Sequence, residues 1–151
     1  MNKSLHDEFV AVCRRRHWKC TEPRWMVYEF VRGNRSHPTV DAVWSHVRAV
    51  RSSTTRESIY RILNEFSEAG ILNRLDHIML ARYDSETRPH GHFICRECGN
   101  IIDFPLPKRT GVPKELDNGT LRGMEIRVSG ICPECLAKVR QGIQDGSEVV
   151  G

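Results

Sequence analysis

Apolar residues recur every three or four positions in the first part of the chain, which predicts a series of short amphipathic helices. Thr21 and Thr39 precede two of these runs as predicted N-caps, Pro23 falls in a first turn, and Gly33 predicts a helix end. The apolar faces of the first three predicted helices are Phe9, Val10 and Cys13; Trp25, Val27, Tyr28, Phe30 and Val31; and a buried stripe of Val40, Val43, Trp44, Val47 and Val50.

The segment STTRESIYRILNEFSEAGIL gives the clearest helical pattern. Thr54 and Glu57 predict a capping box at its start, and Gly70 predicts its end. Its apolar face consists of Ile59, Ile62, Leu63, Phe66 and Ala69, which leaves Arg56, Tyr60, Arg61 and Asn64 on the outward side.

The next segment, ILNRLDHIMLARYD, predicts two short strands about a turn near Asp76 and His77. Helices followed by a hairpin are the order of a winged helix-turn-helix, although a plain helical bundle would show the same helices. In the winged-helix interpretation the last helix enters the DNA major groove, where Asn64 would suit adenine and Tyr60 the thymine methyl group. The candidate DNA-binding residues are Ser53, Arg56, Tyr60, Arg61 and Asn64.

After Asp84 the pattern changes to short strand-like runs, HFIC, IIDF and MEIRVS, and the run ECLAKVRQGI predicts a final helix. The expected class is α+β, with a small zinc-containing α/β domain after the winged helix. The predicted divisions are a DNA-binding domain at 1–82, a hinge at 83–90, a zinc-containing domain at 91–143 and a flexible tail at 144–151.

Charge divides unevenly along the 151 residues. Residues 1–82 hold 14 Lys and Arg against 9 Asp and Glu, whereas residues 83–151 hold 9 against 10. A basic first part fits a nucleic-acid partner, although a solvated surface can give the same count. The sequence contains neither a membrane-length apolar run nor the order of a secretory signal, so we expect a cytoplasmic protein without a membrane partner.

Four of the six cysteines form two CxxC pairs, Cys95 with Cys98 and Cys132 with Cys135. Such pairs suit tetrahedral Zn²⁺, and four thiolates close its coordination shell, so a structural zinc site is expected. The alternative is a pair of redox dithiols, but a redox CxxC begins a helix, and CRECG lies between two strand-like runs. Cys13 and Cys20 are expected to be half-buried packing residues.

A second metal site is indicated by HGH and a later aspartate. Residues two apart on a strand project to the same face, so His90 and His92 can share an ion, with Asp103 alongside on the returning strand. Asp84 and His37 are further candidates, although a histidine at a helix start such as His37 is more often simply solvated.

Taken together, the motifs HPTVDAVW, TTRESIYRILNEFSEAGIL, ARYD, HGHFICRECGNIIDF and SGICPEC resemble the ferric uptake regulator (Fur) family of metal-dependent bacterial transcription regulators. The resemblance implies a homodimeric repressor, dimerised through its second domain, that binds an operator of double-stranded DNA, expected to be an inverted repeat. It implies that Tyr60 and Arg61 lie in the recognition helix. The implied ligands are Cys95, Cys98, Cys132 and Cys135 for one structural Zn²⁺ per subunit, and His37, Asp84, His90, His92 and Asp103 for one regulatory metal.

The regulatory set resembles the peroxide-sensing branch of the family, because Asp103 stands where many iron-uptake members have Glu. Imidazole and carboxylate donors suit Fe²⁺ or Mn²⁺. The alternative is an iron, manganese or zinc uptake regulator without peroxide sensing. The chain departs from the family at Gly123 and Met124, where relatives carry histidines, and in the segment interrupted by Pro113 and Gly119, where they have a longer helix.

Two other classes of protein use similar residues. Two histidines and a carboxylate hold iron in oxygenases, but such enzymes need a substrate pocket that the short remainder of the chain does not predict. A zinc-held interaction module without DNA binding is the other alternative. We therefore expect a regulator and not an enzyme.

Overall fold

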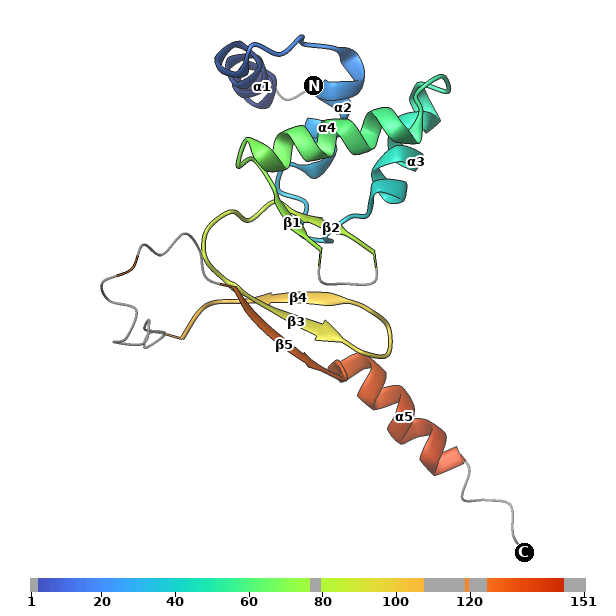
Figure 1. Ribbon diagram of the computed structural model, residues 1–151. Coiled ribbons are helices and arrows are strands. Elements are labelled where there is room, and N and C mark those ends of the chain that lie inside the picture. Colours follow the sequence, from blue (N-terminus) through green and yellow to red (C-terminus); the bar gives the residue numbers. More distant parts are fainter. Residues whose placement is uncertain (1–2, 77–79, 108–118, 120–124, 146–151) are drawn as a thin grey trace, which may run out of the picture. The chain divides into compact units, whose positions relative to one another are not determined.

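The computed structural model describes residues 3–76, 80–107, 119 and 125–145 (Figure 1). The chain divides into two compact units, Met1–Thr87 and Arg88–Gly151. The division falls inside the range 83–90 that the sequence predicts as a hinge. Each unit has its own sheet, and the two are described separately.

The first unit has the order of a winged helix, four helices followed by a two-stranded hairpin. Its elements are α1 (Lys3–Arg16), α2 (Glu22–Val31), α3 (Val40–Val50), α4 (Arg56–Glu68), β1 (Asn73–Leu75) and β2 (Arg82–Asp84). The strands are antiparallel, with Arg74 directly opposite Tyr83. The predicted class is confirmed, although the predicted turn at His77 lies outside the described residues.

Helix α4 starts one residue later than predicted. Thr55 is its N-cap, and the Thr55 hydroxyl accepts a hydrogen bond from the Ser58 backbone N–H at 3.2 Å. The capping box at Thr54 is therefore wrong, because the sequence offers two adjacent threonines and local preference cannot choose between them. Gly70 follows the helix with a φ of 72°, the left-handed conformation that favours glycine at a helix end.

The core of the first unit is built from the predicted apolar faces of its helices. Its fully buried members include Phe9, Val27, Tyr28, Val43, Val47, Ile59, Leu63 and Phe66. Val50 is an exception: its side chain is 69% exposed, because it is the last residue of α3 and extends past the packed turns. Cys13 is fully buried and Cys20 exposed, so the prediction that both are half-buried is also wrong.

Strand β2 is anchored on the turn before α3. The Tyr83 backbone N–H donates to the Pro38 carbonyl at 3.1 Å, and the Arg82 guanidinium donates to the His37 carbonyl at 3.2 Å. Thr39 and Arg82 also form an isolated antiparallel bridge. These bonds bring residues 37 and 84 to the same place, although they are far apart in sequence.

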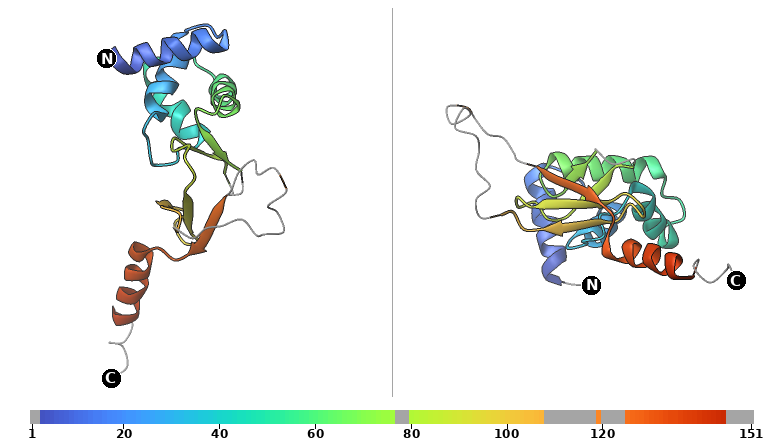
Figure 2. Two further views of the ribbon diagram at one scale, coloured as in Figure 1. Left: turned by 90° about the vertical axis from the view of Figure 1, so that its left-hand side faces the viewer. Right: turned by 90° about the horizontal axis from the view of Figure 1, so that it is seen from below.

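The second unit contains a three-stranded sheet and a helix (Figure 2). Its elements are β3 (Gly91–Cys95), β4 (Ile101–Phe104), β5 (Ile126–Gly130) and α5 (Pro133–Asp145). The strand order is β4-β3-β5, with β4 antiparallel and β5 parallel to β3. Helix α5 extends to Asp145, into the range predicted as a tail.

The two predicted departures from the family, at Gly123 and Met124 and around Pro113, lie outside the described residues. Within the described parts of the chain, every helix is too short or too polar to cross a membrane.

The cap of α4 gives a stability prediction. Thr55→Ala should lower the free energy of unfolding of the first unit by about 1 kcal/mol, because it removes the acceptor for the Ser58 N–H. The matched control is Thr54→Ala, expected within about 0.5 kcal/mol of wild type, since alanine keeps the backbone bonds of Thr54: its carbonyl accepts from the Trp44 indole and its N–H donates to the Arg51 carbonyl.

Urea unfolding followed by tryptophan fluorescence measures this unit alone, because Trp18, Trp25 and Trp44 are the only tryptophans of the chain. A Thr54→Ala loss equal to that of Thr55→Ala would contradict the assignment of the cap.

Candidate metal sites and nucleic-acid surface

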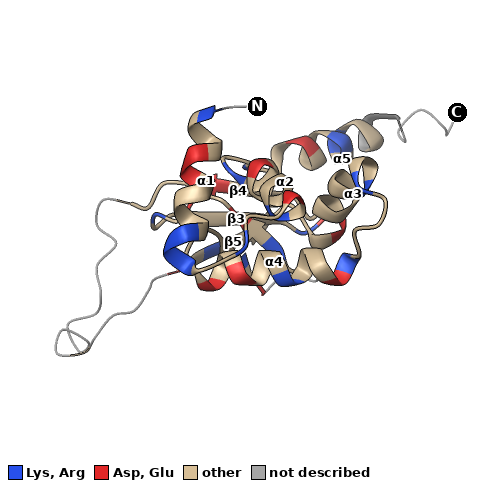
Figure 3. Cartoon of the chain, turned by 90° about the horizontal axis from the view of Figure 1, so that it is seen from above, with Lys and Arg blue, Asp and Glu red and all other residues tan. Residues whose placement is uncertain are grey.

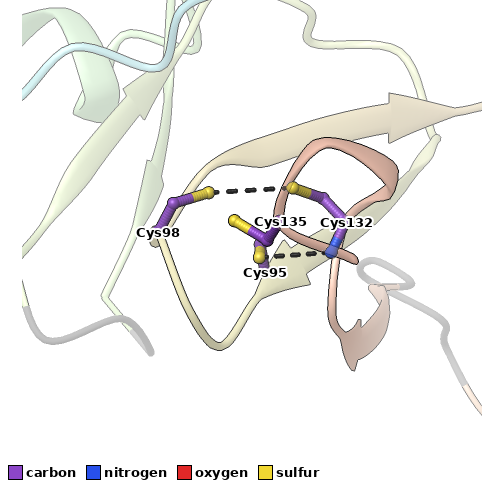
Figure 4. A group of neighbouring side chains, drawn as sticks. All are labelled: Cys95, Cys98, Cys132 and Cys135. Atoms are coloured by element: carbon purple, nitrogen blue, oxygen red, sulfur yellow. Dashed lines mark hydrogen bonds between the residues drawn. The ribbon is translucent and has the colours of Figure 1, made fainter. Parts of the chain in front are cut away.

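The four CxxC cysteines meet in the second unit (Figure 4). Cys95 ends β3, Cys98 lies in the turn after it, and Cys132 and Cys135 lie at the start of α5. All four sulfurs are within 4.8 Å of one another, and the Cys98 and Cys132 sulfurs are 3.8 Å apart. Four sulfurs at about 2.3 Å from a tetrahedral Zn²⁺ are separated by about 3.8 Å. The geometry therefore fits one zinc ion.

The protonation of the cluster is uneven. The Cys98 and Cys132 backbone N–H groups lower the pKa of Cys95 to about 6, and the Cys132 N–H lies 3.2 Å from its sulfur. The neighbouring Cys132 and Cys98 thiols raise the pKa of Cys135 to about 12. Four thiolates this close would repel one another, so a cation must hold them deprotonated together. The donor set fits zinc for this reason as well.

The redox alternative is weaker for a structural reason. Gly99, with a φ of 70°, turns the chain after Cys98 into β4, so the first pair lies in a knuckle. Cys132 and Cys135 lie at the start of a helix, as predicted for the run ECLAKVRQGI, and a redox pair can occur in this context. The sulfurs of that pair face Cys95 and Cys98, however, which favours shared coordination over separate dithiol chemistry.

His92 and Asp103 are directly opposite each other on β3 and β4, so their side chains lie on one face of the hairpin. The Asp103 Oδ1 atom lies 3.7 Å from His92 Nε2 and 3.6 Å from His90 Nε2. Donor atoms about 2.1 Å from a common ion lie at most about 4.2 Å apart. The three residues therefore fit one metal ion, as a three-donor set that we call the sheet ligands.

The tautomer of His90 suits this role. Its Nδ1 atom lies 2.8 Å from the Arg88 carbonyl oxygen, which can only accept a hydrogen bond. The Nδ1 atom must then carry the proton, so Nε2 presents its lone pair. Metal-binding histidines are commonly oriented by such a bond.

The first unit holds the remaining two predicted ligands, which we call the wing ligands. His37 Nε2 and Asp84 Oδ1 are 3.7 Å apart, and both side chains are only 1% exposed. His37 adopts a φ of 50°, a conformation that costs a non-glycine residue about 1–3 kcal/mol and often marks a functional site. A buried carboxylate beside an imidazole offers two hard donors to a cation.

The candidate DNA-binding residues differ in their surroundings. Ser53, Arg56 and Arg61 are exposed, whereas Tyr60 and Asn64 are half-buried. The Arg56 guanidinium forms two hydrogen bonds with Asp41, at 2.6 and 3.2 Å, and lowers the pKa of that carboxyl. Figure 3 shows Lys and Arg residues interspersed with Asp and Glu residues along the helices.

Arg74 of the wing is a residue that the sequence analysis missed. It donates to Asn64 at 2.9 Å and lies 3.4 Å from the Tyr60 hydroxyl. The alternation of side chains along a strand could have identified it. Arg74 projects to the opposite face of β1 from Asn73 and Leu75, and that face can lie against α4.

Known proteins resemble this chain in sequence. The sequence model described as "Ferric uptake regulator family" matches residues 15–126. The peroxide-responsive repressor PerR of Staphylococcus epidermidis is 27% identical over 133 residues, which cover 85% of this chain and 89% of the relative.

Two solved structures are similar in fold. The ferric uptake regulator of Francisella tularensis, solved with iron, has a TM-score of 0.67 at 28% identity, and the match covers 79% of this chain and 95% of that one. The Helicobacter pylori ferric uptake regulator Fur, whose structure reveals three functional metal binding sites, has a TM-score of 0.69 at 20% identity, covering 89% and 93%.

The cysteine cluster gives a prediction about metal content. Cys98→Ser should purify with far less zinc than wild type after dialysis against a chelator, because three thiolates leave the tetrahedral shell open. Elemental analysis by mass spectrometry measures zinc per chain. Cys20→Ser is the matched control, since Cys20 is exposed and lies in the other unit. Equal zinc retention by both variants would contradict a four-cysteine site.

Proposed function

Because the chain belongs to the ferric uptake regulator family, whose members are DNA-binding transcription regulators, we propose that it represses transcription in response to a bound metal. The observation that carries this proposal is the pair of ligand sets, each with donor atoms 3.6–3.7 Å apart. The wing ligands belong to the DNA-binding unit and the sheet ligands to the zinc-containing unit.

We infer that the two sets complete one site. The wing ligands supply two donors and the sheet ligands three, and five nitrogen and oxygen donors suit Fe²⁺ or Mn²⁺. His37 and Asp84 would then tether the winged helix to the second unit, which restricts the angle at which α4 is presented. Restricting that angle makes DNA affinity depend on metal occupancy, with a typical coupling of about 1–3 kcal/mol.

The partner in this proposal is an operator of double-stranded DNA with inverted repeats. A two-fold dimer presents two recognition helices to half-sites about one helical turn apart. Exposed apolar side chains of the second unit support a homodimer through that unit; they are Ile102, Val128, Ile131, Leu136 and Val139. Reduced zinc-binding thiols and a DNA partner support action in the cytoplasm.

Peroxide sensing is supported by the similarity to PerR and by Asp103 in the sheet ligands. His37, Asp84 and the sheet ligands would hold the Fe²⁺, whose redox chemistry toward H₂O₂ would be catalytic in iron, with each electron that it gives up regained from the oxidised imidazole. His37 or His90 would gain one oxygen atom on a ring carbon, one H₂O₂ would be consumed, and one water would leave. The oxidised imidazole would bind metal less well, which would release the DNA.

The alternative is an uptake regulator that responds to iron, manganese or zinc without oxidation, and the similarity to the Francisella regulator solved with iron favours it. Either role is regulatory, and we propose no catalytic turnover.

Removing a wing ligand tests whether metal occupancy controls DNA affinity. His37→Ala should reduce the effect of Mn²⁺ on DNA affinity from about 5- to 150-fold to about 1-fold, because the ion can no longer tether the two units. Gel shifts on operator DNA with and without Mn²⁺ measure the ratio. His46→Ala is the control, since His46 is exposed on α3. The zinc content of His37→Ala should stay unchanged. A normal Mn²⁺ response in this variant would contradict the proposal that the metal tethers the two units.

Oxidation separates the two regulatory roles. After anaerobic loading with Fe²⁺ and a pulse of H₂O₂, the peptide carrying His37 or His90 should gain the mass of one oxygen atom in a mass spectrum. A sample loaded with Mn²⁺ should not, because Mn²⁺ does not give this reaction readily. An unmodified pair of peptides in the Fe²⁺ sample would support the uptake regulator instead.

A further inference from the structure

The wing contacts the recognition helix through two side chains on one face. Arg74 and Tyr83 are direct partners across β1 and β2, so both project to the same side of the hairpin. The Arg74 guanidinium donates to the Asn64 side-chain oxygen at 2.9 Å, and the Tyr83 hydroxyl lies 3.3 Å from the same oxygen. One atom of α4 thus receives both wing side chains.

The chemistry of the partners fixes which end of the Asn64 amide they hold. A guanidinium has only donors, so the atom that faces Arg74 must be the carbonyl oxygen, however the amide is drawn. Tyr83 is 1% exposed, and its hydroxyl donates to the same oxygen. A carbonyl oxygen has two lone pairs, and these bonds use both. Asn64 can therefore offer a ligand only an N–H group.

Tyr60 is held in a similar way. Arg74 Nη1 lies 3.4 Å from the Tyr60 hydroxyl oxygen, and the guanidinium carbon is 5.7 Å from the ring centroid. Donors from Asn64 and then Arg74 lower the pKa of Tyr60, as expected when its oxygen accepts. The Tyr60 O–H is then the group left to donate. Asp76 accepts from Arg74 Nε at 2.5 Å and keeps the guanidinium in place.

We propose that Asn64 and Tyr60 contact DNA as hydrogen-bond donors only, and that Arg74 of the wing is the positioning residue that makes them so. The proposal rests on the proposed function, because it assumes that α4 lies in the major groove. It goes further by naming the bases to which these side chains can donate hydrogen bonds.

Donors in the major groove find acceptors on guanine, at N7 and O6, on thymine, at O4, and on adenine, at N7, where the N6 amino donor lies beside the acceptor. The paired reading of adenine by asparagine needs an oxygen to accept from the adenine amino group, and here Arg74 and Tyr83 occupy that oxygen. Cytosine presents a donor and is disfavoured as well. Asn64 should thus favour guanine or thymine, which present acceptors without a donor, over adenine, whose N7 lies beside an amino donor. The adenine preference expected from its residue type is lost.

Selection from a library of duplex DNA with a randomised stretch tests this, using the full-length protein loaded with Zn²⁺ and Mn²⁺. Asn64→Ala identifies the base position that Asn64 reads, as the position whose preference it relaxes. Wild type should favour guanine or thymine there over cytosine by about 2- to 10-fold, as expected for a single hydrogen bond, and should not favour adenine over guanine.

Arg74→Ala should move the preference at that one position toward adenine, because one lone pair of the Asn64 oxygen becomes available while Tyr83 still donates to the other. Arg74→Lys should keep guanine or thymine, since an ammonium still donates to that oxygen. A merely structural Arg74 would instead weaken binding to all sequences alike. Asn64→Asp is a second variant that keeps an acceptor for Arg74 but presents oxygen to the groove, so it should favour cytosine.

Three results would overturn the proposal: adenine or cytosine favoured by wild type at the Asn64 position, no position that responds to Asn64→Ala, or an unchanged preference in Arg74→Ala. These results leave sequence-specific DNA binding intact. Failure of wild type to enrich any sequence would reject the proposed function itself, and this inference with it. Tryptophan fluorescence of each variant verifies that the first unit is folded.

Discussion

Three consecutive residues of strand β2 determine how the first unit is arranged. Arg82 donates to the His37 carbonyl, Tyr83 packs in the core and reaches Asn64, and Asp84 lies beside the His37 imidazole. A strand of three residues forms few backbone hydrogen bonds with its partner strand. Its position is therefore fixed by these side chains and by the hydrogen bond from the Tyr83 N–H to the Pro38 carbonyl. The strand therefore connects helix α4 with the wing ligands inside one rigid segment.

The second unit depends in the same way on its cysteine cluster. Cys95 ends β3, the strand that carries His92, and Cys98 begins the turn that returns the chain to β4 and Asp103. A zinc ion that fixes this turn also fixes the register that sets His92 opposite Asp103. The closed site is thus a support for the open one, because metal ligands must be held by a rigid second layer of contacts.

Helix α4 illustrates how tertiary contacts change the chemistry of a side chain. An asparagine is both donor and acceptor in isolation, but the bonds from Arg74 and Tyr83 leave it a donor. Arg56 is similarly occupied by Asp41. Residue type alone therefore overstates the number of bases that the side chains of a helix can recognise. Neighbouring elements can already form hydrogen bonds with the same polar atoms.

The sequence by itself predicted the helices, the winged-helix order, the clustering of the four cysteines and the closeness of His90, His92 and Asp103. These follow from local periodicity and short spacing, such as the CxxC pairs and His92 two residues after His90. Only the tertiary structure decided the cap at Thr55, the exposure of Val50 and the bond between Arg74 and Asn64. Such features depend on contacts between elements distant in sequence, or on a choice between neighbouring residues of equal local preference, which no local pattern resolves.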